Sequence, residues 1–133
     1  VYLYFKKVIG KSGEDIACEY LKLNNYKIME RNYSCYQGEI DIIAKDCKKN
    51  ELVFIEVKTR TNKLYGRPID AIDKNKKRHI YNSCKYYLYK NKITNCFIRI
   101  DAIEIYFVEN KSVVNHIKQI IWIETIDKVD IKR

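Results

Sequence analysis

Two short motifs in the middle of the chain contain the residue types that metal-assisted phosphate chemistry uses. Gly38-Glu39-Ile40-Asp41 is followed, after 14 residues, by Glu56-Val57-Lys58-Thr59-Arg60. Mg²⁺ in proteins is typically held by one or two carboxylates together with water and phosphate oxygens. A lysine adds a positive point charge that can bind phosphate or orient a water molecule. These residues could therefore form a nuclease-type site if the fold brings Asp41, Glu56 and Lys58 together.

A β-hairpin is the element that must bring them together. The segments 39–46 and 51–59 are rich in β-forming residues and flank the polar loop 47–50. Loops of this length are common in hairpins. We therefore predict antiparallel pairing in which Asp46 lies opposite Glu51.

This register determines which charged side chains meet. It places Asp41 opposite Glu56 and Glu39 opposite Lys58, all on one face of the sheet. A surface ion pair between Glu39 and Lys58 is a plain alternative for part of this patch. It leaves two opposed carboxylates unexplained, because like charges destabilise a sheet and burial raises the pKa of a carboxyl group. A divalent cation held by Asp41 and Glu56 removes that conflict.

Hydrophobic periodicity predicts the element order α-β-β-β-α-β-β in one domain over residues 1–133. The second helix can connect two parallel strands, which gives an α/β fold with a mixed sheet flanked by helices. We expect a core over about 8–120 and a charged tail over 124–133. The predicted helices are 10–25 and 73–91, and the predicted strands are 27–36, 39–46, 51–59, 96–108 and, at an edge, 113–123.

Composition narrows the class of partner. The chain has 26 Lys and Arg against 17 Asp and Glu, a net charge of +9, which favours a polyanion such as nucleic acid or an anionic membrane surface. An AT-rich genome also encodes many lysines, so the charge is weak support by itself. The five cysteines show no paired spacing, and free thiols are expected. No apolar run approaches the roughly 20 residues that span a bilayer, so we expect a cytoplasmic protein.

Further basic residues are candidates for contact with a nucleic-acid backbone. Arg60 ends the second motif, and Lys76, Lys77 and Arg78 lie in the first turns of the second predicted helix. Lysines and arginines supply the salt-dependent part of nucleic-acid affinity. A solvated helix face is the alternative for the helical residues.

Three other polar residues are given structural interpretations. Asp101, within an apolar strand, is expected to pair with Arg99 rather than to support a metal site. His79 and His116 lack the spacing of metal ligands and are expected to be structural.

Four runs of the sequence together resemble the YraN family of bacterial proteins. They are Gly13-Glu14-Asp15-Ile16-Ala17, Arg31-Asn32-Tyr33, the G-E-I-D run and Phe54 to Arg60, with Ile40 where the wider superfamily often has proline. The resemblance covers about residues 8–120. That family is described as predicted endonucleases of the PD-(D/E)XK, or restriction endonuclease-like, superfamily, distantly related to archaeal Holliday junction resolvases.

The resemblance implies a restriction endonuclease-like α-β-β-β-α-β core and a site for Mg²⁺ or Mn²⁺. Metal ligands would be Asp41, Glu56 and the backbone carbonyl of Val57. Lys58 would have a catalytic role, and Glu14 would be the carboxylate that the first helix brings to the site.

The expected function is that of a divalent-metal-dependent endonuclease that hydrolyses phosphodiester bonds in nucleic acid. DNA is favoured over RNA, branched DNA is one candidate substrate, and a homodimer would suit a four-way junction with two scissile strands. The principal alternative is a non-catalytic nucleic-acid binding module on the same fold. A metal-independent RNA endonuclease that uses His and Tyr, and a domain with no nucleic-acid role, also remain open.

Overall fold

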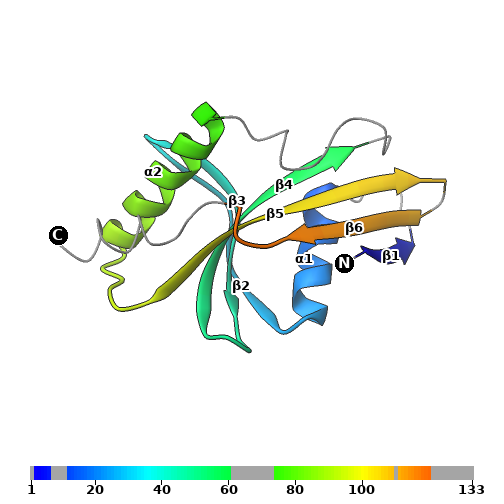
Figure 1. Cartoon of the computed structure of the whole chain (residues 1–133), viewed down its shortest axis with the longest axis horizontal. Helices are drawn as coiled ribbons and strands as arrows, with labels where there is room; N and C mark the ends of the chain where they lie inside the picture. The colour runs from blue at the N-terminus through cyan, green and yellow to red at the C-terminus, as the bar shows by residue number, and fades with distance from the viewer. Residues whose placement is uncertain (1, 7–11, 61–73, 110, 121–133) are drawn as a thin grey trace.

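The computed structural model describes residues 2–6, 12–60, 74–109 and 111–120. Within them, α1 and all strands and helices after it follow one another in the predicted order, and β1 precedes them (Figure 1). The elements are β1 (Tyr2–Lys6), α1 (Gly13–Leu23), β2 (Tyr26–Cys35), β3 (Gly38–Asp46), β4 (Glu51–Arg60), α2 (Lys74–Lys90), β5 (Phe97–Val108) and β6 (Lys111–Ile117).

The strands form one mixed sheet in the order β1-β6-β5-β4-β3-β2. β4 and β5 are parallel, whereas the other neighbouring pairs are antiparallel. α2 lies in the connection between the two parallel strands, as a crossover requires. The predicted fold class, an α/β fold with an α-β-β-β-α-β core, is therefore confirmed.

Each face of the sheet packs against one helix. On one face, α2 contributes Ile80 and Leu88 to a core that includes Phe54. On the other, α1 contributes Leu21 to a core that includes Ile55. Because neighbouring residues of a strand point to opposite faces, β4 supplies side chains to both cores. Figure 1 shows α2 and α1 on separate parts of the twisted sheet.

The β3–β4 register is the predicted one, but the pairing ends directly before the two candidate metal ligands. Asp46 pairs with Glu51, and the pairing continues to Ile42 and Ile55. Beyond that, β3 remains paired with β2, and β4 remains paired with β5 as far as Arg60. The two strands therefore part directly before Asp41 and Glu56. The predicted pairings of Asp41 with Glu56 and of Glu39 with Lys58 are wrong for this reason.

The two ends of the sheet differ from the prediction. β6 is not an edge strand, because β1 pairs with its outer side, from Tyr2 opposite Asn115 to Lys6 opposite Lys111. β1 itself was not predicted, since a five-residue strand depends on a partner more than a hundred residues away. The predicted tail at 124–133 falls outside the described residues.

Local signals determine where α1 begins. The Ser12 hydroxyl accepts a hydrogen bond from the Asp15 N–H, and the Asp15 carboxylate accepts one from the Ser12 N–H. This is the capping box that the sequence indicates. Gly13 packs so closely on β4 that an added Cβ would lie 2.2 Å from the Thr59 hydroxyl oxygen. The cap and the glycine together fix the first turn of α1 against the end of β4.

Candidate functional site

Asp41 and Glu56 lie where β3 and β4 separate. Asp41 Oδ2 accepts a hydrogen bond of 2.7 Å from the backbone N–H of Val57, the residue after Glu56. A side-chain oxygen of β3 thus contacts the backbone of β4 at the point where the paired register has ended. This side-chain contact, and not the predicted strand pairing, holds the Asp41 carboxylate near Glu56.

Both carboxyl groups are held in surroundings that disfavour their charge. Glu56 is only 5% exposed, and burial raises its pKa, with the nearby Asp41 charge adding to the effect. Burial also raises the pKa of Asp41, assisted by the charge of Glu14 and opposed by the Val57 hydrogen bond. A buried Glu56 beside a half-buried Asp41, both with raised pKa values, is an electrostatic arrangement that a bound cation would relieve.

Two lysines approach this pair. Lys76, in the first turn of α2, places Nζ 3.2 Å from Glu56 Oε1. Lys58 Nζ lies 3.9 Å from the same oxygen. Both positive charges lower the pKa of Glu56 and so offset part of the effect of burial. The structure thus brings together Asp41, Glu56 and Lys58, and adds Lys76, which the sequence suggested only as a nucleic-acid contact.

Glu14 lies near the pair but is engaged elsewhere. Its Oε1 accepts a hydrogen bond of 3.0 Å from Nε of Arg31, while Asp15 accepts one of 2.7 Å from the same guanidinium group. Glu14 is close enough to raise the pKa of Asp41. Among the described residues, no three His, Cys, Asp or Glu side chains are grouped as a metal site requires. A role for Glu14 as a third ligand stays a prediction.

The other basic residues predicted to contact nucleic acid differ in their exposure and in their partners. Arg60 is bound through Nε to Oε2 of Glu104 at 3.2 Å and is mostly buried. In α2, Lys77 is half-buried and Arg78 is exposed. Only Lys76 of these four residues contacts the carboxylate pair in the described structure.

Glu104 is a residue that the sequence reading missed. It is fully buried and also accepts hydrogen bonds from the Tyr106 hydroxyl at 2.9 Å and from the Asn115 amide at 3.0 Å. It pairs with Lys58 across the parallel strands, so its carboxylate shares a face of the sheet with Glu56. A glutamate between two isoleucines of a β-strand was the available signal, because buried charges are paired.

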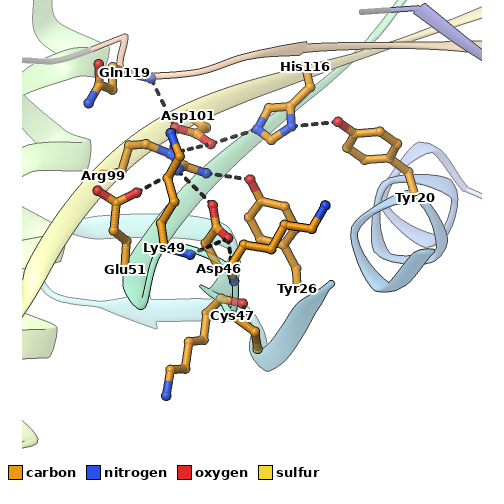
Figure 2. A network of polar contacts seen from close by, with 12 residues as sticks. Tyr20, Tyr26, Asp46, Cys47, Lys49, Glu51, Arg99, Asp101, His116 and Gln119 are labelled. Atoms are coloured by element: carbon orange, nitrogen blue, oxygen red, sulfur yellow. Dashed lines mark hydrogen bonds and ion pairs between the residues drawn. The ribbon is translucent and has the colours of Figure 1, made fainter. Parts of the chain in front are cut away.

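A second polar network lies on the α1 face of the sheet, centred on the buried Arg99 (Figure 2). Its Nε donates to Asp101 at 2.9 Å, and its Nη1 donates to Asp46 at 3.0 Å and to Glu51 at 2.8 Å. The expected pairing of Arg99 with Asp101 is confirmed. The roles of Asp46 and Glu51 were missed, although the same hairpin register places them side by side.

The network continues to α1 through His116. Its Nε2 lies 2.7 Å from Asp101 Oδ2, and its Nδ1 lies 2.8 Å from the Tyr20 hydroxyl oxygen. Burial alone would raise the pKa of Asp101, but hydrogen bonds from His116 and Arg99 outweigh it and leave that pKa below its usual value. An ionised Asp101 can only accept, so Nε2–H of His116 donates to it. The structural role expected for His116 is confirmed.

Two further sequence expectations concern the whole chain. All five cysteines are free thiols, as their scattered spacing predicts. Within the described residues, neither helix combines the length and the hydrophobicity that a membrane crossing needs.

Comparison with known proteins places the chain in a family. The model of the uncharacterised protein family UPF0102 matches residues 13–105. A UPF0102 protein of Caldicellulosiruptor saccharolyticus is 44% identical over 101 residues, covering 76% of this chain and 84% of the relative. A UPF0102 protein of Clostridium botulinum (strain 657 / Type Ba4) is 50% identical over 103 residues, covering 77% and 82%. The chain therefore belongs to family UPF0102, the YraN family that its motifs resemble.

Proposed function

We propose that this protein is a divalent-metal-dependent endonuclease of the PD-(D/E)XK type that hydrolyses phosphodiester bonds in nucleic acid, DNA in preference to RNA. The observation that carries the proposal is a pair of neighbouring carboxyl groups with raised pKa values, the half-buried Asp41 and the buried Glu56, at the point where β3 and β4 part. A fold gains nothing from placing two such groups together, because burial and mutual repulsion both act against their charge. A bound cation would stabilise both carboxylates in their charged form.

The donor set fits Mg²⁺ or Mn²⁺. Two carboxylates are what Mg²⁺ usually takes from a protein, with water and substrate phosphate completing its shell. Asp41 and Glu56 would hold the ion, and the Val57 carbonyl is a further candidate because Asp41 fixes the backbone of that residue. When bound, the ion would acidify water and stabilise negative charge on a phosphate.

The chain's own residues would then position the reactants. During hydrolysis a water oxygen bonds to phosphorus, the bond from phosphorus to one ester oxygen breaks, and that oxygen takes up a proton. Lys58, next to Glu56, would orient the water or bind the phosphate. Lys76 would neutralise Glu56 in the metal-free protein and turn to a substrate phosphate when a cation replaces it.

The experiment is a cleavage assay on branched, single-stranded and duplex DNA and on RNA, with Mg²⁺ or Mn²⁺ against EDTA. We expect metal-dependent products that Asp41→Asn, Glu56→Gln and Lys58→Ala each abolish without lowering the melting temperature by more than a few degrees. Glu109→Gln, at an exposed turn remote from the pair, is the matched control and should cleave normally. Full cleavage by Asp41→Asn would exclude the assignment.

A non-catalytic nucleic-acid binding module is the second candidate. It is favoured by the contact of Lys76 with Glu56, which already compensates one carboxylate without a metal. It predicts salt-sensitive binding, no turnover with either metal, and unchanged binding by Asp41→Asn. Homodimer formation stays a prediction for either function.

A further inference from the structure

Exposed aromatic rings gather where the β2–β3 turn meets α2. Tyr36, in the turn, is 98% exposed, and Tyr89, on α2, is 63% exposed. Tyrosine is enriched at interfaces because it combines an apolar ring with a polar hydroxyl, and exposed apolar side chains that lie in one patch mark interaction sites. Neither ring belongs to the carboxylate site.

The turn lies tightly against the helix, which brings Tyr36 to the hollow that Tyr86 of α2 also lines. Gly38 has φ of +146°, and a Cβ added to it would lie 3.2 Å from Ser83 Oγ and 3.4 Å from His79 Cβ. Any other residue would be strained at this φ, and its Cβ would press on Ser83 and His79. The glycine of the G-E-I-D run therefore does more than precede Asp41, because it also holds Tyr36 beside α2.

Two hollows lie side by side on this surface and share Tyr86 in their walls. The first, of about 230 Å³, is lined also by Lys85 and Tyr89. The second, of about 310 Å³, is lined also by Tyr36 and Lys90. Each hollow thus combines aromatic rings with a lysine. We call these two hollows and their walls the tyrosine–lysine surface.

The lysines are held next to rings rather than projecting freely. Lys85 Nζ lies 5.3 Å from the ring centroid of Tyr81, and Lys90 Nζ lies 5.7 Å from that of Tyr86. Such contacts fix an ammonium group beside an aromatic face. Rings for stacking, interleaved with cations for phosphates, are the two features with which proteins bind single-stranded nucleic acid.

We propose that the tyrosine–lysine surface binds an unpaired nucleic-acid strand. Tyr36 and Tyr86 would stack on bases, and Lys85 and Lys90 would contact the backbone. A duplex fits poorly, because its bases already stack on one another and do not offer their faces. The proposal rests on the proposed function for the class of ligand, and it adds that the preferred substrate contains single-stranded nucleotides.

The surface lies at a useful distance from the carboxylate pair. Lys76, which contacts Glu56, and Tyr86 are both on α2, ten residues apart, or about 15 Å along the helix axis. A stacked strand rises by about 3.4 Å per nucleotide, so roughly four nucleotides would join the two places. One strand could therefore occupy both.

One residue of the second hollow opposes this ligand. Glu30 lines it and carries a negative charge on the same side as Lys90. Its removal should tighten binding of a polyanion, a gain that damage to the fold would not produce. Glu30→Gln is therefore a variant with an effect opposite to that of the tyrosine variants.

The test measures fluorescence anisotropy of a labelled single-stranded oligonucleotide, as DNA and as RNA, and of a matched duplex, all in EDTA. Tyr36→Ala should weaken single-strand binding about five- to a hundredfold, the range for loss of one base stack, and duplex binding far less. Tyr36→Phe, which keeps the ring, should bind normally, as should Phe97→Ala, an exposed aromatic outside both hollows. Glu30→Gln should bind more tightly.

The outcomes separate this inference from the proposed function. Equal single-strand affinities of Tyr36→Ala and the wild type would overturn the proposal that the tyrosine–lysine surface binds a single strand, even if the protein cleaves DNA. Affinity that depends on Tyr36 would support it, even if no metal produces cleavage. Weaker binding by Tyr36→Ala to duplex and single strand alike would also overturn it, because stacking on unpaired bases requires the difference.

Discussion

At the scale of single residues, Glu56 is the carboxyl group on which opposing electrostatic influences meet. Burial and the charge of Asp41 raise its pKa, while Lys76 and Lys58 lower it. The metal-free protein thus contains a strained electrostatic arrangement that its cations relieve only in part. Sites that serve a ligand commonly carry such a cost in stability.

Asp41→Asn should therefore stabilise the metal-free protein. An acid whose pKa is raised by folding costs stability above its folded pKa, and the cost disappears at low pH, where folded and unfolded chains are both protonated. Asparagine removes the charge and keeps an oxygen for the Val57 N–H. At pH 7 in EDTA, calorimetry should show a melting temperature about 2–4 °C higher, and the gain should vanish near pH 3. A lower melting temperature at pH 7 would contradict this.

Lys76→Gln should increase the affinity for Mn²⁺. Lys76 Nζ and a metal ion compete for the same Glu56 carboxylate. The loss of one partly exposed ion pair, worth up to about 1 kcal/mol, corresponds to roughly fivefold tighter binding in isothermal titration calorimetry. Lys77→Gln, the neighbouring half-buried lysine, is the control. Equal Mn²⁺ affinities of the two variants would show that Lys76 does not occupy the metal position.

At the scale of elements, Arg99 adds side-chain ion pairs to the backbone pairing of β3, β4 and β5. From β5 it binds Asp46 at the end of β3 and Glu51 at the start of β4, besides Asp101 on its own strand. These contacts hold the hairpin end of the sheet, opposite to the end where β3 and β4 part. They thereby anchor the paired part of β3 and β4, from which Asp41 and Glu56 follow at the open end.

Arg99→Met should destabilise the fold strongly. It would leave three carboxylates close together, two of them buried, and removal of one partner from a buried ion pair costs about 3–5 kcal/mol. Arg31→Met removes an exposed arginine with two ion pairs and should cost less than about 1 kcal/mol. Urea unfolding of both variants makes the comparison. Similar losses would mean that the Arg99 network contributes little.

Acid should unfold the protein through the same network. Burial raises the pKa of Asp46 and of Asp101, but hydrogen bonds from Arg99 to Asp46, and from His116 and Arg99 to Asp101, leave both pKa values below their usual range. A depressed folded pKa gives stability that is complete above the unfolded value near 3.9 and is lost as pH falls through the folded value. Melting temperatures should fall steeply below about pH 4. In Asp101→Asn this fall should be shallower, and an unchanged slope would contradict the assignment.

Elements could be predicted from local patterns, and their partners could not. The four-residue loop was enough to predict the β3–β4 register from Asp46 and Glu51 to Ile42 and Ile55, directly before Asp41 and Glu56. β1 was missed, and β6 was wrongly placed at an edge, because their pairing joins distant parts of the chain. Lys76 at Glu56 and Arg60 at Glu104 were unforeseen for the same reason. The hydrophobic periodicity of a helix or a strand predicts its buried face but not the element that packs against that face.

At the scale of the whole molecule, the two faces of the sheet carry different groups of polar residues. The α1 face is closed by the Arg99 network and a dense core. The α2 face carries the carboxylate pair, the buried Glu104 and, beyond the helix, the tyrosine–lysine surface. The net charge of +9 suits a polyanion that follows α2 from Lys76 toward its C-terminal end.

Binding of a single strand should depend on salt, with a share from each lysine of that surface. The logarithm of affinity falls linearly with the logarithm of salt concentration, by about 0.7 for each phosphate contact to a single strand. Lys85→Gln should reduce the magnitude of the slope by about that amount. Lys27→Gln, an exposed lysine on β2, should leave the slope unchanged. A slope unaffected by Lys85→Gln would place the strand elsewhere.

The most direct measurement is the anomalous scattering of a crystal soaked in Mn²⁺. The account predicts a peak between the carboxylates of Asp41 and Glu56, with Lys76 turned away from Glu56, and no such peak in a crystal of Asp41→Asn. A well-ordered wild-type site without manganese at saturating concentration, or with manganese only at other carboxylates, would contradict it.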